Sequence, residues 1–416
     1  MGGNAKHMPH VWEHLDHTFG DVSILLEDLT SGTVSVTEKF DGINMHFRVD
    51  ASGVVRFSRN ETDRKKGGVD FSKMLDHYAS HPARETIIEG IRTIDEHFSS
   101  GWWPFGFSGR NWVNAEIVYT HRPQLLKYDQ NAIVLHEVVT FLPSAQKLVD
   151  PELQEGLEKV CPSEPVTTIT GFEWVVLPPQ HVELLPQNGE GFLNEVQRRL
   201  RVCMESCGLT EQNTLRDFLR ESLMKGAISE LQIGAARQRQ LANRIAGSEG
   251  APRLIDIKKG LPQGLAARVS ELGQVKNRDR VHRETMQPII NTISAFGSAR
   301  LATTKSMLIA DGEGEVKRLQ AEIDGARFRI NECDDQDAGP RRDLFEKFMG
   351  EYDSLGGSPS AIEGITFMWN DKKTKLTGIF STLNQAIGVD RYGRGTIGPT
   401  PQKVGNFNLA EWFGLV

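Results

Sequence analysis

Alternating hydrophobic and polar residues predict five short strands in the first third of the chain. Each run is rich in β-branched or aromatic side chains, and several alternate with period two. These strands are predicted over residues 34–40, 43–49, 54–59, 112–119 and 132–141. Asp50-Ala51-Ser52-Gly53 predicts a hairpin turn between the second and third strands. A helical pattern over residues 69–100 interrupts the series.

Helical periodicity replaces the strand pattern in the middle of the chain. Residues from about 185 to 305 carry apolar positions at helical spacing, broken by Gly and Pro, and a further helix is predicted around 313–330. Asn213 or Thr214 is suited to cap one of these helices. Four histidines, His7, His10, His14 and His17, have the spacing of one helix face, and we expect surface or core positions for them rather than a metal site.

Two more strands are predicted near the end, over residues 361–369 and 373–383, joined by a turn at 370–372. The order of elements predicts an α+β fold, in which one β-rich domain is split by a helical insertion. We divide the chain into the first part of the β-rich domain (1–150), a mainly helical insertion (151–350), and the last strands with a C-terminal tail (351–416).

Composition narrows the class of protein. Hydrophobic residues make up 38% of the 416 and charged residues 25%, which suits a folded chain with a substantial core. The sequence has no apolar stretch long enough to cross a membrane and no signal-peptide core near its start, so we expect a cytoplasmic protein without membrane contact. The cysteines form no CxxC pair, which fits a reducing compartment: Cys161, Cys203, Cys207 and Cys333.

Charge is unevenly distributed along the chain. The net charge of -7 argues against nucleic acid as a partner when taken alone. Residues 195–305, however, contain 19 Lys or Arg against 11 Asp or Glu, a net charge of +8, which leaves -15 for the rest. Clustered Arg and Lys in this segment suit contact with a phosphate backbone, although solvated helix faces remain an alternative.

A lysine at a strand end carries the strongest chemical signal. Lys39 is followed by Asp41 and Gly42 in the run Thr-Glu-Lys-Phe-Asp-Gly-Ile-Asn. A deprotonated lysine can attack phosphorus, and nearby cations can lower its pKa from the ordinary value of about 10.4. Asp41 can order the nucleophile or a metal-bound water, and Gly42 allows the backbone to approach a nucleotide closely.

Further charged residues follow this lysine in a fixed order. Arg59 ends the next strand but one, Glu116 lies within a strand, and Glu363 precedes Gly-Ile much later. Lys373 and Lys375 lie on one face of the last strand, since alternate residues of a strand share a face.

The ordered series resembles the covalent lysyl-nucleotidyltransferases, the superfamily of DNA ligases, RNA ligases and mRNA capping enzymes. The resemblance covers about residues 1–145 and 355–385 and departs from the usual pattern at Thr366, where an aliphatic residue is common. It implies an antiparallel-sheet, ATP-grasp-like adenylation domain. Too few residues follow Lys375 for the oligonucleotide-binding (OB) barrel that trails DNA ligases, so no C-terminal OB barrel is expected.

The resemblance also implies a role for each matching residue. Lys39 corresponds to the nucleophile that forms lysyl-AMP, with Asp41 and Gly42 completing its motif. Glu38 corresponds to a residue beside adenine, Asn44 to an asparagine that is frequent in RNA ligases, and Arg59 to an arginine that contacts ribose or phosphate. Glu116 and Glu363 correspond to the acids that contact ribose and the metal ion. Lys373 and Lys375 correspond to the lysines that hold the α-phosphate. The usual aromatic base-stacking residue is missing, and His136, Phe40 or Phe141 could substitute for it.

We therefore expect an ATP-dependent ligase, monomeric and using Mg²⁺ or Mn²⁺, that joins RNA or DNA ends. Asn44 and the missing barrel favour RNA, and the layout also resembles ligase-like proteins of phages. Two alternatives stay open: a nucleotidyltransferase that modifies a protein or small molecule, and a non-catalytic factor with the same fold.

Overall fold

The fold was analysed in a computed structural model of the chain. The structure describes residues 8–79, 81, 83–99, 110–120, 126–141, 147–149, 153, 155–184, 190–331 and 359–378. Its strands are β1 (Val36–Lys39), β2 (Ile43–Val49), β3 (Val55–Ser58), β4 (Asn111–Val118), β5 (Ala132–Phe141), β6 (Lys147–Val149), β7 (Val166–Thr167), β8 (Glu173–Leu177), β9 (His181–Val182), β10 (Gly364–Trp369) and β11 (Lys372–Thr377).

Helices occupy two regions of the chain. Those before residue 161 are the 3-10 helix η1 (Val11–Glu13), α1 (Phe19–Ser31), α2 (Glu61–Lys65), α3 (Phe71–Asp76), α4 (Arg84–Phe98) and α6 (Leu157–Val160). Those after residue 189 are α7 (Glu190–Ser206), α8 (Leu215–Lys225), α9 (Ala235–Ile245), α10 (Leu254–Lys258), α11 (Gln263–Gly273), α12 (Val275–Leu301) and α13 (Gly312–Asn331). Thr214 caps α8, accepting a hydrogen bond from the backbone of Asp217, as the sequence predicted.

The described strands form two sheets. The small sheet has four strands in the order β11-β10-β1-β9, and the large sheet has seven, in the order β3-β2-β4-β5-β8-β7 with β6 also paired to β5. The α+β class is confirmed, but the expectation of purely antiparallel sheets was wrong, because β5 and β8 pair in parallel. More than 30 residues separate the ends of these two strands, which is enough chain for the crossover that parallel pairing requires.

The predicted strands of the first third are confirmed as β1 to β5, and the final hairpin as β10 and β11. Lys372, which was predicted in the turn, belongs to β11, and residues 379–383 of the last predicted strand lie outside the described residues. The turn of the hairpin consists of Asn370 and Asp371, both with positive φ, which suits a tight two-residue connection. The long helix expected over 69–100 was wrong in its extent, because the structure has two helices there, α3 and α4. Pro82 lies between them in the sequence, and proline cannot continue a helix from the preceding turn.

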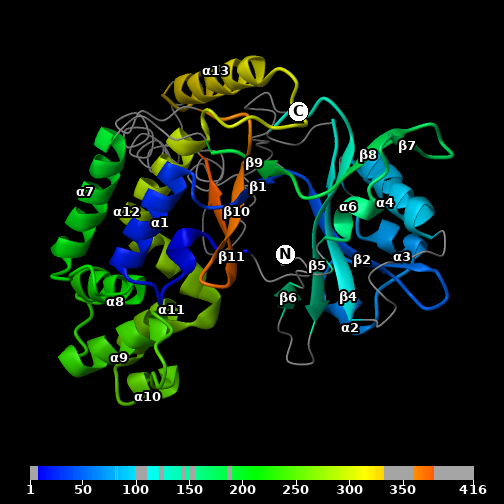
Figure 1. The fold of residues 1–416 in the computed structure, drawn as a ribbon. Coiled ribbons are helices and arrows are strands. Elements are labelled where there is room, and N and C mark those ends of the chain that lie inside the picture. Colours follow the sequence, from blue (N-terminus) through cyan, green and yellow to red (C-terminus); the bar gives the residue numbers. More distant parts are fainter. Residues whose placement is uncertain are drawn as a thin grey trace.

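Two hydrophobic cores underlie this arrangement. One lies between the large sheet and α4, where Ile87, Ile91 and Ile94 are fully buried. The other joins the helices that follow residue 189 to α1 and to the small sheet, including Ile365 and Leu376. Figure 1 shows the small sheet between these helices and the large sheet, so the helical region and the lysine-bearing strands share one core.

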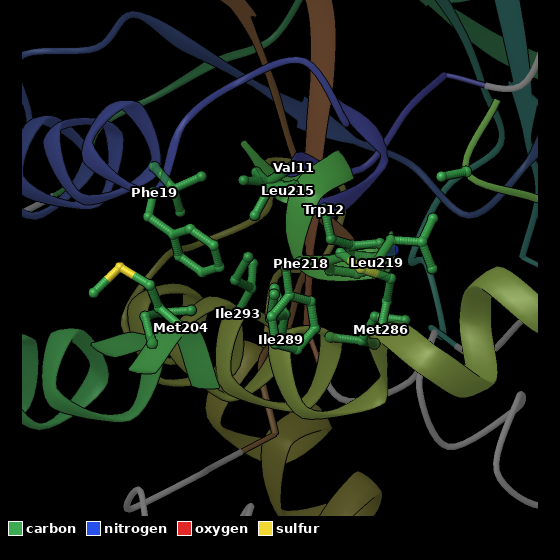
Figure 2. Close-up of a cluster of buried hydrophobic side chains, with 14 of the residues drawn as sticks. Val11, Trp12, Phe19, Met204, Leu215, Phe218, Leu219, Met286, Ile289 and Ile293 are labelled. Carbon is green, nitrogen blue, oxygen red and sulfur yellow. The ribbon is translucent and has the colours of Figure 1, made fainter. Parts of the chain in front are cut away.

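The second core begins at the N-terminal segment. Val11, Trp12 and Phe19 pack against apolar side chains of the later helices, shown in Figure 2: Met204, Leu215, Phe218, Leu219, Met286, Ile289 and Ile293. Burial of such side chains contributes on the order of 2 kcal/mol each relative to exposure. A segment near the start of the chain is thereby fixed against helices nearly 300 residues away.

The spacing of the N-terminal histidines suggested that they lie along one helix face. The structure does not bear this out. Only the short η1 forms there. His14 shares a hydrogen bond of 2.9 Å with the hydroxyl of Thr374, and His17 stacks on Trp369 at 4.1 Å. His14 thus anchors the segment to β11 and His17 anchors it to β10, and the amide of Lys375 on β11 donates to the carbonyl of Pro9. His7 lies outside the described residues.

The division at residues 150 and 350 stays a prediction. Three strands, β7, β8 and β9, fall within 151–350, and all three belong to the sheets that carry the first strands. In the part of the chain that the structure describes, no helix is both long and apolar enough to span a bilayer.

Candidate active site

Lys39 lies at the end of β1, next to the last strands of the chain. Its cross-strand partner on β10 is Gly364, so Glu363 comes directly beside it. The Nζ atom of Lys39 donates to Oε2 of Glu363 at 2.5 Å, and the two side chains are 22% and 16% exposed. Strand pairing therefore joins two residues that are 324 positions apart in the sequence.

The environment of Lys39 stabilises its charged form. Burial by itself lowers the pKa of Lys39, but the charges of Glu363 and then Glu116 outweigh it, so the pKa lies above its ordinary value. The expectation that neighbouring cations, including a metal ion, lower this pKa stays a prediction. Before it can act as a nucleophile, Lys39 must release a proton, and Glu363 is an acceptor in direct contact with it.

Lys375 is the lysine with the depressed pKa. Its register on β11 places it beside Thr366, which in turn pairs with Thr37 of β1, so it shares a sheet face with Lys39. Lys375 is only 8% exposed. Burial, followed by repulsion from Lys39, lowers its pKa to about 8. The structure thus brings together two of the predicted lysines.

Lys373 connects the two sheets. It lies two residues before Lys375, on the same face of β11, and donates to Oε2 of Glu137 on β5 at 3.0 Å. Glu137 is almost fully buried and also accepts from Asn114 at 3.0 Å. This ion pair joins β11 of the small sheet directly to β5 of the large sheet.

The large sheet contributes Asn44 and Glu116, which lie opposite each other on neighbouring strands. These residues are direct cross-strand partners on β2 and β4, and the side-chain amide of Asn44 donates to Asn114 at 2.7 Å. Glu116 accepts from the backbone amide of Gly42 at 3.1 Å and contacts His136 at 3.2 Å. Its charge acts on Lys39 and Glu363, which places it at the same site.

A β-bulge positions His136, one of the candidates for base stacking, and supplies Glu137, which sequence reasoning did not single out. The pairing of β4 with β5 shifts between Asn114 and Ala115, so that Asn114 pairs with Glu137 while Ala115 pairs with Leu135. His136 is the extra residue. Bulges redirect side chains and are common beside active sites, and here His136 and Glu137 both contact residues of the site. Two adjacent polar residues within an apolar strand were the available signal.

The turn after Lys39 carries the chain from the small sheet to the large one. Its backbone is held by two side chains: Tyr128 accepts from the amide of Asp41 at 2.8 Å, and Glu116 accepts from the amide of Gly42. Sequence reasoning did not include Tyr128, which lies in the connection between β4 and β5 and gave no motif signal.

Arg59 and Glu38 make contacts that differ from those of the other predicted site residues. The Arg59 guanidinium donates to the carbonyl of Asn44 and lies 5.8 Å from the ring of Tyr78. Glu38 does not join Lys39, because adjacent residues of β1 point to opposite faces. Its carboxyl is buried on the face shared with Ile365, where burial raises its pKa to about 8. The placement of Glu38 beside the adenine stays a prediction.

Of the three candidates for base stacking, His136 lies best for the role. Phe40 is fully buried, and its ring centroid is 6.3 Å from that of His136. Phe141 belongs to a separate apolar cluster with Trp112. His136 contacts Glu116 with a side chain that is 13% exposed.

Glu116 and Glu363 suit a hard divalent cation. Mg²⁺ is commonly held by one or two carboxylates together with waters and substrate phosphates, and these two carboxylates flank Lys39. No group of three or more His, Cys, Asp or Glu side chains with metal-site geometry occurs among the described residues. The donor set therefore fits a cation that arrives with a phosphate ligand.

Gly42 is required by packing against β4. A Cβ atom at this position would lie 2.6 Å from the carbonyl oxygen of Ile117 and 2.7 Å from Cγ of Glu116. We expect Gly42→Ala to lower the free energy of unfolding by about 1–3 kcal/mol, the typical cost of overpacking, measured by urea denaturation. Gly264→Ala is the control, because its Cβ would meet no atom within 4 Å and its backbone lies within the helix α11. An unchanged stability in Gly42→Ala would contradict this packing.

Comparisons with known proteins add little to this site. No protein-family model matches the chain, and no curated protein matches it in sequence. A solved structure named "Archaeal ATP-dependent RNA ligase - form 1" is similar to it at 12% sequence identity and a TM-score of 0.21, over 92% of this chain and 81% of that one. A TM-score this low establishes no shared fold, so the function is inferred from the site itself.

Proposed function

We propose that the protein is an ATP-dependent polynucleotide ligase, with RNA ends as its substrates, that works through a lysyl-AMP intermediate. The observation that carries this proposal is the convergence of Lys39, Glu363 and Lys375 from the small sheet with Glu116 from the large sheet. An amine flanked by carboxylates and a second cation suits attack on a nucleotide α-phosphate.

The first step would be made by Lys39. Its ammonium gives a proton to Glu363, and the free amine attacks the α-phosphorus of ATP, forming a P–N bond while the bond to pyrophosphate breaks. Lys375 is suited to stabilise the negative charge on the α-phosphate oxygens. A divalent cation held by Glu116 and Glu363 would supply further charge neutralisation.

Two transfers would complete the reaction. The 5′-phosphate of a polynucleotide attacks the phosphorus of lysyl-AMP, so the P–N bond breaks and Lys39 is regenerated. A 3′-hydroxyl then attacks the activated 5′-phosphate, forming the phosphodiester and releasing AMP. Lys373 would leave Glu137 to contact phosphate during these steps.

The helical region is the proposed contact for the polynucleotide. Its basic residues are not all available for this, since Arg244 donates to the backbone of Pro252 and Gly273. Others are exposed on α7 and on α9 to α12, namely Arg201, Arg239, Lys259, Arg268, Arg278 and Arg283. Exposed cations bind phosphate without sequence preference and with strong dependence on salt.

The proposal is tested with ATP labelled at the α-phosphate, in the presence of Mg²⁺. We expect a covalent adduct with the mass of one AMP, located on Lys39 by peptide mass spectrometry. Sealing is then assayed on single-stranded RNA, nicked RNA and nicked DNA carrying 5′-phosphate and 3′-hydroxyl ends. Absence of the adduct under all these conditions would refute the proposal, whereas an adduct that moves only to a protein would assign a different acceptor.

The triple variant Arg239→Ala, Arg278→Ala and Arg283→Ala tests the helical contact. We expect weaker RNA binding and a salt dependence of log K reduced by about 0.7 for each lost contact with single strands. The measurement is fluorescence anisotropy of labelled RNA over a range of salt concentrations. Lys159→Ala, an exposed lysine outside the helical region, serves as the control. An unchanged slope in the triple variant would place the RNA contact elsewhere.

A further inference from the structure

Tyr128 connects the turn after Lys39 to the helical region. Its side chain is 1% exposed, and its hydroxyl accepts the backbone amide of Asp41 at 2.8 Å. This amide belongs to the turn that carries the chain between the two sheets. A change in the position of Tyr128 would therefore move the turn that orients the nucleophile.

The residues on either side of Tyr128 are bound to one segment of the helical region. Lys127 donates its amide to Glu315 of α13 at 2.9 Å. Asp129 donates its amide to the carbonyl of Leu308 at 2.9 Å, and its carboxylate accepts from the amide of Ala310. Three hydrogen bonds thus fix both neighbours of one buried tyrosine to Leu308–Glu315, which we call the docking segment.

The docking segment is itself anchored. Leu308 and Ile309 are buried, and Glu315 is 6% exposed and paired with Arg318. The segment follows α12 after a connection of six residues, and α12 carries Arg278 and Arg283 of the proposed RNA contact. The chain therefore leads from α12 to the docking segment, which is hydrogen-bonded to both neighbours of Tyr128, and Tyr128 in turn binds the amide of Asp41.

We propose that Tyr128 is a positioning residue that sets the turn after Lys39 for attack and transmits to it the state of the docking segment. This inference rests on the proposed ligase function. A side chain serving only to fill the core would affect stability when changed, and would leave the rate of the chemical step unaltered. Tyr128 hydrogen-bonds the turn through its hydroxyl, while its ring lies 6.2 Å from the ring of Phe40 in the same turn. Removing the hydroxyl and keeping the ring therefore separates the two roles.

The test uses Tyr128→Phe in the full-length protein. We expect kcat for lysyl-AMP formation to fall about tenfold, with KM for ATP unchanged, because the Asp41 amide loses its buried acceptor. Hydrogen exchange of the peptide covering residues 37–44 is expected to become faster in the variant without nucleotide. A wild-type rate together with wild-type exchange would overturn the inference.

Asp129 provides the matched pair that tests transmission. Asp129→Ala removes the acceptor of the Ala310 amide at an exposed position, and Asp129→Asn retains a carbonyl oxygen that can replace it. We expect Asp129→Ala to slow adenylation about threefold, a modest loss for one hydrogen bond at an exposed position, and Asp129→Asn to restore the rate. In the Tyr128→Phe background, Asp129→Ala should cause no further loss. Additive losses would overturn transmission through Tyr128.

The two proposals fail in distinguishable ways. If the wild-type protein forms no lysyl-AMP, the ligase function fails, while hydrogen exchange still reports whether Tyr128 and Asp129 hold the turn. If the wild type forms lysyl-AMP and the variants match it, the function stands and the positioning role is refuted.

Discussion

Lys39→Ala is expected to reduce covalent AMP transfer to background, a loss on the order of 10⁴-fold or more, because the proposed nucleophile is removed outright. The Nζ atom of Lys39 is the group through which the P–N bond would form, and it donates a hydrogen bond to Glu363, the proposed acceptor of its proton. The measurement is incorporation of label from α-labelled ATP at saturating nucleotide, followed by intact mass.

The control for this variant is Lys372→Ala. Lys372 is exposed, lies on the same hairpin as Lys373, and is not among the proposed site residues. Because Lys39→Ala leaves the Glu363 carboxylate without its cation, thermal unfolding should accompany the assay. A folded Lys39→Ala protein that still takes up label would refute the assignment of the nucleophile, whichever residue then carries the AMP.

The predicted site residues that the structure brings together share one property, a place in regular strand pairing. Glu363 reaches Lys39 because Gly364 pairs with Lys39, and Glu116 is placed by its rung with Asn44. Such positions follow from motif order once the strands are known. The position of Glu38 could have been predicted as well, since period-two alternation puts adjacent residues on opposite faces.

Other features of the site depend on irregular or distant contacts. Glu137 enters through a bulge, which shifts the register by one residue and leaves no specific sequence pattern. Tyr128 acts from a loop whose position depends on hydrogen bonds to residues about 180 positions later. The pKa of Lys39 depends on the balance between burial and two carboxylates, which no local pattern encodes.

The fold divides in the same way. Alternation and helical periodicity predicted the long strands and the helical middle, because those patterns arise from burial on one face. Short strands such as β7 and β9 have only two residues each and carry too little pattern. The parallel pairing of β5 with β8 depends on a crossover path, and the shared core of the helices and the small sheet depends on packing between distant segments.

Lys375→Met is expected to lower the catalytic rate while it raises the stability of the fold. We expect adenylation at saturating ATP to fall by about 10²- to 10³-fold, because the cation proposed to stabilise charge on the α-phosphate is lost. Methionine is similar in length and apolar, so it retains the packing of a residue that is only 8% exposed. Single-turnover formation of lysyl-AMP measures the effect directly.

The same variant is expected to be more stable than the wild type at pH 7. Burial and repulsion from Lys39 lower the pKa of Lys375 from 10.5 to about 8, so keeping its ammonium in the fold costs on the order of 3 kcal/mol. Between pH 8 and 10.5 the unfolded wild-type chain binds more protons than the folded one, so Lys375 makes wild-type stability rise with pH in this window. Lys375→Met should lack that rise. Reduced stability of Lys375→Met at pH 7, or unaltered adenylation, would contradict the role given to Lys375. A variant that is more stable and nearly inactive would show that the fold retains this buried charge for chemistry.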